Sequence, residues 1–385
     1  MKKGANKMLA RSSFSNTASQ RDVYVAGIGH FLPGDPIPVD SIDKILGEIT
    51  KAPPNVLRRI HRIRPVMRKL LGIDFVHYVL DPVTRKPTES NVSMAVKAAT
   101  KALNSAGVSP SEIDLIVYAG AFFDYMSPPS STLVQERLGI DYCAEMAIHS
   151  NCTSIYKAIQ VASDQISLGR YHTALVVTSQ ISSTCFKVET LNEEHVTVEQ
   201  AILRWFLSDG AGAMVLSDKN PGPSKLRVVD TYIESVGANL ENGMTGFAAP
   251  GGWDLLEIYR TGKHHVTQDL NRVGKIGPKL TSEAFERMLN ATGLDTGRVK
   301  CLLLNLPMRH LCTFAEVTLK ELVANPEARL YSNINMVGYA GPAASIISLD
   351  HYLDNNHLKP HDVLISFAVE SSKWMHGAFI LEQDS

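Results

Sequence analysis

Two stretches of the sequence resemble each other, and this internal repeat limits the chain to folds built from two similar halves. Residues 102–118 (ALNSAGVSPSEIDLIVY) resemble residues 288–304 (MLNATGLDTGRVKCLLL). Two further pairs follow in the same order along each copy, namely residues 172–183 with 361–372 and residues 212–216 with 377–381. Because chance similarity rarely preserves order, we infer the duplication of one supersecondary unit.

Each copy predicts a helix, a glycine cap and then a buried strand. The helix expected over 92–105 is followed by Gly107, and the helix expected over 281–290 is followed by Gly293. Apolar runs predict the strands, at residues 115–118 and 302–304. Alternating helices and apolar strands favour α/β architecture with largely parallel, buried sheets. We therefore expect two duplicated halves that pack face to face as a five-layer α/β/α/β/α sandwich.

The sequence predicts three segments. Residues 1–20 contain no Asp or Glu and several Lys, Ser and Asn. We interpret residues 1–21 as a disordered basic tail rather than as a transit peptide, because arginines are sparse there and no apolar stripe is evident. The polar, Pro- and Gly-containing stretch near residue 218 predicts the connection between an N-terminal half, 22–218, and a C-terminal half, 219–385.

Composition excludes several classes of function. The net charge of −1 gives no general attraction to nucleic acid or membrane, and no apolar run is long enough to span a bilayer. Five cysteines without a CxxC pair argue against a disulfide framework or a structural zinc site. A reducing, cytoplasmic location is therefore the expectation.

Cys152 is the candidate nucleophile. Small and polar residues precede it, and apolar residues at helical spacing follow it, so it is expected at a turn between a strand and a helix. Free N–H groups and the helix dipole at such a turn should lower the pKa of the thiol and hold an oxyanion. The alternative is a buried, inert cysteine, which is the commoner fate of a free thiol.

Four motifs, in the same order, resemble a known family. They are VAGIGHFLP at 25–33, DYMSPPSSTLVQERLG at 124–139, NCTS at 151–154 and SDGAGAMVL at 208–216. Together they are similar to 3-oxoacyl-(acyl-carrier-protein) synthase III, a member of the thiolase-like ketosynthase superfamily. The resemblance covers residues 22–382 and implies a thiolase-like fold, with Cys152 taking an acyl group from acyl-CoA or acyl-carrier protein.

The resemblance also exposes departures at the site. The family pairs its cysteine with His and Asn, but Met308 stands at the aligned His and Ala340 at the aligned Asn. The family's glycine-rich loop is replaced by VESSKWMHG at 369–377. His310 is either a displaced catalytic histidine or a surface residue of the following helix. Glu370 is a candidate base, although charged loop residues usually face solvent.

The resemblance implies an acyltransferase that forms an acyl-cysteine intermediate, for fatty-acid, polyketide or related secondary metabolism. The alternatives are a non-catalytic ketosynthase-like subunit that pairs with an active partner, and transfer to an oxygen or nitrogen acceptor without condensation. The implied chemistry needs no metal or redox cofactor. The expected partners are acyl-CoA or acyl-carrier protein, docked through the basic stretch 57–69 or Arg309, and a second copy of the chain in a homodimer.

Overall fold

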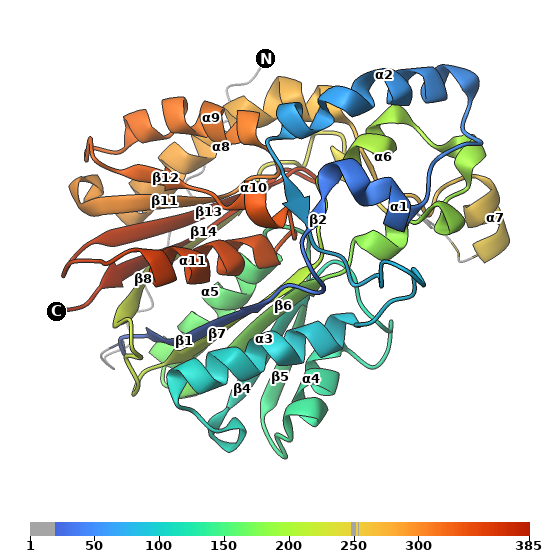
Figure 1. Cartoon of the computed structure of the whole chain (residues 1–385). Helices are drawn as coiled ribbons and strands as arrows, with labels where there is room; N and C mark the ends of the chain where they lie inside the picture. Colours follow the sequence, from blue (N-terminus) through green and yellow to red (C-terminus); the bar gives the residue numbers. More distant parts are fainter. Residues whose placement is uncertain (1–19, 248–251, 253) are drawn as a thin grey trace.

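One mixed sheet forms the centre of the computed structural model, which describes residues 20–247, 252 and 254–385 (Figure 1). Apart from residues 20 and 21, the tail expected over 1–21 lies outside the described residues. The strands in spatial order are β12 (Arg329–Tyr331), β11 (Val299–Asn305), β13 (Val363–Glu370), β14 (Met375–Gln383), β8 (Leu226–Ser235), β1 (Tyr24–Phe31), β7 (Gly210–Ser217), β6 (Thr173–Gln180), β4 (Leu115–Gly120) and β5 (Ala144–His149).

The order of the strands repeats, as the internal duplication predicts. Outward from the middle, one half reads β1-β7-β6-β4-β5 and the other reads β8-β14-β13-β11-β12. The halves meet where β1 pairs with β8 at only two positions, Tyr24 with Arg227 and Val25 with Leu226. The expectation of a largely parallel sheet is wrong, because β7 and β14 each run antiparallel to both of their neighbours.

The helices complete five layers, which confirms the predicted thiolase-like α/β sandwich. Helices α5 (Ser154–Ser167) and α11 (Ala343–Asn355) lie between the halves, and each contacts strands of both. Helices α3 (Asn91–Ala106) and α4 (Ser130–Leu138) cover the outer face of the first half. Helices α8 (Leu270–Thr292) and α9 (Arg309–Thr318) cover the second (Figure 1).

Small residues bring the outer helix α3 close to β1. Its buried face consists largely of alanines, and Ser90 caps its first turn by accepting a hydrogen bond from the backbone N–H of Ser93. A Cβ atom added to Gly27 on β1 would lie 2.2 Å from the backbone oxygen of Ala102. Glycine is therefore required at this position for the helix and the strand to pack.

Most of the remaining elements lie near one end of the sheet (Figure 1). They are α1 (Ile42–Leu46), α2 (Pro54–Leu71), α6 (Val198–Leu203), α7 (Leu255–Arg260), α10 (Ile334–Val337), and the short strands β2 (Ile37–Pro38), β3 (Phe75–Val76), β9 (Met244–Thr245) and β10 (Thr267–Gln268). The helices α1, α2, α6 and α7 among them are seen at the right of Figure 1. Several of the remaining elements share an apolar cluster of their own, separate from the cores between the layers. Within the described residues, the helices include none with the length and hydropathy needed to cross a bilayer.

Candidate active site

Cys152 lies in the turn between β5 and α5, where the sequence predicted it. Strand β5 ends at His149 and helix α5 begins at Ser154, so Cys152 comes two residues before the first helical residue. Helix α5 belongs to the middle layer, between the two halves of the sheet. The turn therefore presents the sulfur to residues from the second copy of the repeat.

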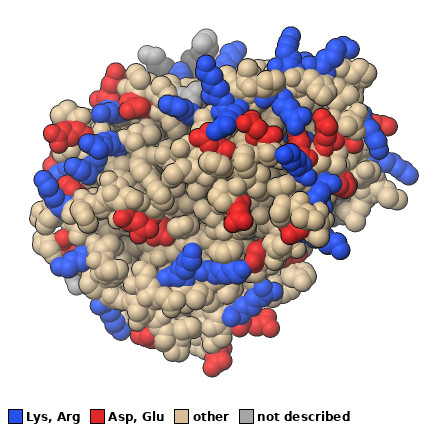
Figure 2. All heavy atoms as spheres, in the orientation of Figure 1, with Lys and Arg blue, Asp and Glu red and all other residues tan. Residues whose placement is uncertain are grey.

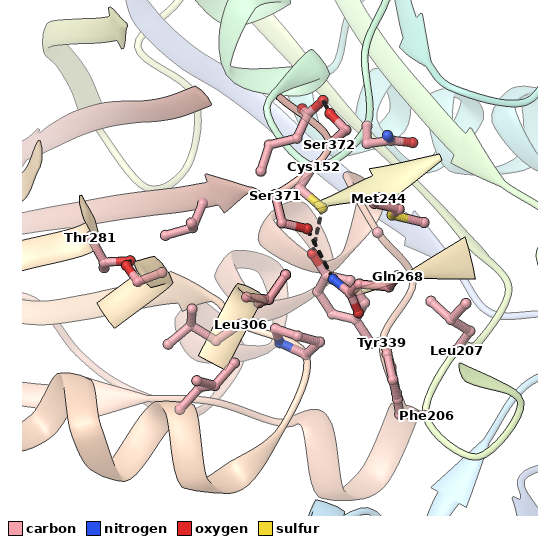
Figure 3. Close-up of a pocket in the computed structure, with 18 of the residues that line it drawn as sticks. Cys152, Phe206, Leu207, Met244, Gln268, Thr281, Leu306, Tyr339, Ser371 and Ser372 are labelled. Atoms are coloured by element: carbon pink, nitrogen blue, oxygen red, sulfur yellow. Dashed lines mark hydrogen bonds between the residues drawn. The ribbon is translucent and has the colours of Figure 1, made fainter. Parts of the chain in front are cut away.

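Tyr339 is a hydrogen-bond partner of Cys152. Its Oη donates to the Sγ of Cys152 across 2.8 Å (Figure 3). The backbone around Tyr339 is fixed, because its N–H donates to the oxygen of Phe206 and its oxygen accepts from the N–H of Ser208. Burial raises the pKa of Tyr339 well above 10, so the phenol keeps its proton and remains a donor at any physiological pH.

Glu370 ends β13 beneath the same turn, with only 2% of its surface exposed. Its carboxylate accepts hydrogen bonds from the backbone N–H and the hydroxyl of Thr153, at 3.0 and 2.6 Å, and from the hydroxyl of Ser372 at 2.6 Å. The hydroxyl of Ser150 lies 3.0 Å from one carboxylate oxygen and 3.1 Å from the other. The expectation that a charge here would face solvent is therefore wrong, because four donor groups replace the water.

The electrostatics of the turn differ from the sequence expectation. Burial, followed by the nearby charge of Glu370, raises the pKa of Cys152 to about 12, although the Tyr339 hydrogen bond acts in the other direction. The expected lowering at the helix N-terminus is therefore wrong. Burial also raises the pKa of Glu370, but hydrogen bonds from Ser372 and Thr153 outweigh it and the net pKa lies below the ordinary value. The resting pair is a neutral thiol beside a carboxylate.

A mostly apolar cavity of about 100 Å³ opens beside Cys152 (Figure 3). Side chains from α6, α8 and α9 and from nearby loops line it, among them Leu203, Phe206, Leu207, Val273, Leu311 and Phe314. Polar residues line one part of it, among them Gln180, Glu370 and Gln268, whose amide N–H donates to the Oγ of Ser371 across 2.9 Å. A hydrocarbon chain fits such a lining, and the polar groups are suited to orienting a carbonyl.

Comparison with known proteins supports the resemblance seen in the sequence. The family model for 3-oxoacyl-(acyl-carrier-protein) synthase III matches residues 146–237, which include the nucleophile turn. A β-ketoacyl-(acyl-carrier-protein) synthase III of Desulfitobacterium hafniense (strain Y51) is 25% identical over 283 residues, which cover 71% of this chain and 77% of the relative. The corresponding protein of Staphylococcus aureus (strain JH1) is also 25% identical, over 77% of this chain and 83% of the relative.

The chain is similar to 3-oxoacyl-(acyl-carrier-protein) synthase III in sequence and in fold. Its thiolase-like fold is similar to that of three solved structures. They are the tetronic acid condensing enzyme AbyA1 (TM-score 0.75, 22% identity, 94% of this chain and 99% of that one), synthase III of Pseudomonas aeruginosa (0.72, 19%, 95% and 99%), and Xanthomonas campestris OleA with bound lauric acid and lauroyl-CoA (0.74, 18%, 95% and 100%).

The two substituted positions of this synthase III-like chain stay out of the cavity. Met308 precedes α9 and packs in the separate apolar cluster that α1, α2 and α10 share, while Leu306 and Pro307 line the cavity instead. Ala340 is fully buried, and its neighbours Tyr339 and Gly341 line the cavity. Neither position therefore offers a donor to a substrate beside Cys152.

His310 lies in the first turn of α9, and its side chain is outside the described part of the structure. Its proposed catalytic role stays a prediction. Sequence reasoning missed Tyr339, which is 187 residues away from Cys152 along the chain. The one available signal was its place beside Ala340, the residue aligned with the family's Asn.

Proposed function

We propose that this synthase III-like enzyme is an acyl-condensing or acyl-transferring enzyme that carries the acyl group as a thioester on Cys152. The observation that supports this most is the sulfur itself, which faces an apolar cavity and accepts the hydrogen bond of a permanently protonated phenol, that of Tyr339. Acyl-CoA or acyl-carrier protein is the proposed donor. The curated relatives are named for synthesis on acyl-carrier protein, and the OleA structure contains lauroyl-CoA.

Acylation exchanges one thioester for another. The sulfur of Cys152 attacks the carbonyl carbon of the donor, a C–S bond forms, and the donor's thiolate leaves with the proton that the cysteine thiol has lost. The Tyr339 phenol donates to the sulfur while it carries negative charge and so stabilises the thiolate. The apolar lining excludes water from the acyl chain, which protects the intermediate from hydrolysis.

The acyl group can leave Cys152 in two ways, by decarboxylative condensation or by transfer without decarboxylation. Decarboxylative condensation requires donors aimed at a developing enolate oxygen, and losing such donors costs several kcal/mol. The positions of the family's His and Asn carry Met308 and Ala340, neither of which lines the cavity. This observation favours the second candidate, transfer of the acyl group to a hydroxyl or amine without decarboxylation.

The acyl-cysteine is tested by incubating the protein with a panel of acyl-CoA and acyl-carrier thioesters and measuring its intact mass. We expect an adduct with at least one donor, absent in Cys152→Ala and retained in Cys143→Ala, which removes another partly exposed cysteine. If no donor in the panel gives an adduct, the acyl-enzyme proposal is wrong and the non-catalytic subunit is favoured. Release of labelled carbon dioxide from a malonyl thioester by the acylated enzyme would identify condensation.

A basic surface supports the proposed donors. Figure 2 shows Lys and Arg side chains gathered over the region of α2, with acidic side chains among them. Arg68 and Lys69 of α2 and Arg309 of α9 border the same surface hollow, which brings together the two docking candidates of the sequence. We propose that an acidic carrier protein or the phosphates of CoA dock here. The homodimer stays a prediction.

A further inference from the structure

Glu370 holds the nucleophile turn from both sides. Its carboxylate binds the hydroxyl of Ser150 and both the N–H and the hydroxyl of Thr153, and these residues flank Asn151 and Cys152. The sequence spacing between Thr153 and Glu370 is 217 residues, so this contact joins the first copy of the repeat to the second. The geometry by itself makes Glu370 a residue that positions the turn.

The carboxylate also brings a negative charge to the sulfur. Among the described side chains, the titratable groups that face Cys152 are Glu370 and the phenols of Tyr339 and Tyr156, and the phenols keep their protons because burial raises the pKa of each above 10. The cation on the other side of Glu370 is Lys157 of α5, whose Nζ donates to the hydroxyl of Ser150 across 2.8 Å. Glu370 is therefore the charge that acts directly on Cys152.

We propose that Glu370 is a positioning residue that keeps Cys152 a neutral thiol in the resting enzyme and prolongs the life of the acyl-enzyme. This inference rests on the proposed acyl-cysteine. A carboxylate repels a thiolate but does not repel an uncharged thioester, so it disfavours the thiolate before acylation and also as the leaving group. Release of the acyl group then requires the acceptor. The acceptor loses a proton as it attacks the thioester, and the sulfur of Cys152 takes up that proton as the C–S bond breaks.

The test is the pH dependence of alkylation of Cys152 by iodoacetamide, a neutral reagent, measured by peptide mass. Glu370→Gln keeps the shape of the side chain and removes its charge. We expect its alkylation curve to move to lower pH, with a rate at about pH 8 that is roughly tenfold that of the unmodified enzyme. Glu370→Asp should stay near the unmodified curve, as should Glu327→Gln, which neutralises an exposed carboxylate before β12.

Two further variants separate the charge from the hydrogen bonds. Thr153→Val removes one hydroxyl from the turn and leaves the carboxylate, so its curve should not move to lower pH. Lys157→Met removes the cation that partly balances Glu370, so its curve should move to higher pH. Because Lys157 is only partly buried, we expect Lys157→Met to fold. Its alkylation curve therefore tests the inference even if Glu370→Gln does not fold.

The acyl-enzyme gives an independent readout. After loading from an acyl-CoA, the thioester of Glu370→Gln should hydrolyse several-fold faster than that of the unmodified enzyme, because its leaving thiol is less basic. A folded Glu370→Gln whose alkylation curve is unchanged, or is matched by that of Thr153→Val, would overturn the inference. If the unmodified enzyme accepts no acyl group, the proposed function fails instead, and the alkylation curves still report whether Glu370 acts on the sulfur.

Discussion

At the scale of single residues, the sulfur of Cys152 has a phenol as its hydrogen-bond partner. Tyr339 directly precedes Ala340, the residue aligned with the family's Asn, and its hydroxyl reaches the sulfur itself. A phenol whose pKa is raised well above 10 by burial donates a hydrogen bond but gives up its proton reluctantly. The geometry therefore supports stabilisation of charge on the sulfur rather than proton transfer from Tyr339.

Tyr339→Phe should slow acylation of Cys152 by about tenfold or more, because a hydrogen bond to a charged acceptor contributes about 1.5–3 kcal/mol. The measurement is the rate at which the acyl adduct appears by mass at saturating acyl-CoA. Tyr118→Phe serves as the matched control, since Tyr118 is also fully buried and bonds a side chain, that of Ser179, away from the cavity. Equal rates for Tyr339→Phe and the unmodified enzyme would show that the phenol does not assist acylation.

The sequence predicted the place of Cys152 but not its surroundings. The turn could be located because residues adjacent in the chain, a strand end and an apolar helix pattern, define it. The pKa was mispredicted because Cys152 is buried by tertiary packing and because Glu370 approaches it from the second copy of the repeat. Local patterns do not report charges that approach through tertiary packing. The sequence therefore offered Glu370 as a candidate base but not as a partner of the Cys152 turn, and it did not offer Tyr339 at all.

At the scale of elements, periodic segments were predicted well and interrupted ones were not. The helix expected over 92–105 is α3, Asn91–Ala106, and the strand expected over 115–118 is β4, Leu115–Gly120. The helix expected over 281–290 is the end of α8, which begins at Leu270. Gly277 and Pro278 indicate a break, but packing of α8 on the second half of the sheet outweighs their poor helix propensity.

Two glycines with different surroundings, Gly27 on β1 and Gly274 in α8, test the packing of β1 against α3. Gly27→Ala should destabilise the fold by about 1–3 kcal/mol or more, because the added Cβ would approach two backbone atoms of α3 closer than 3.0 Å. Gly274→Ala, within α8 and with no atom in reach of its Cβ, should instead stabilise by about 0.5–1 kcal/mol. Urea unfolding of both variants measures the two changes. The packing argument is wrong if Gly27→Ala unfolds at the same urea concentration as the unmodified protein.

At the scale of the whole molecule, an ionic cluster around the buried Glu234 joins elements of the second half. Glu234 on β8 accepts two hydrogen bonds of 2.8 Å from Arg287 on α8, and it lies 2.8 Å from the Nδ1 of His376 on β14. Burial raises the pKa of Glu234, but the hydrogen bonds from Arg287 and Tyr232 and the nearby His376 outweigh it and hold the pKa at about 2. The charged carboxylate is therefore part of what stabilises the folded chain.

This cluster predicts how stability depends on acidity. A carboxyl whose pKa is lower in the folded than in the unfolded state stabilises the fold above its ordinary pKa of 4.5, and this contribution is lost as the pH falls to about 2. Glu234→Gln should be less stable at neutral pH and should lose less stability over that acidic interval. Denaturant unfolding at a series of pH values measures how the free energy of unfolding of each protein depends on pH. The same pH dependence for Glu234→Gln and the unmodified protein would contradict the assignment.

The duplication gives each half an equivalent turn at the middle layer, one before α5 and one before α11. The first turn supplies Cys152 and the second supplies Tyr339 and Gly341. Two separate copies of one ancestral unit would have had to place the same residue at both turns. Joining two copies in one chain removes this constraint, so one turn can carry a thiol while the other carries the phenol that binds it.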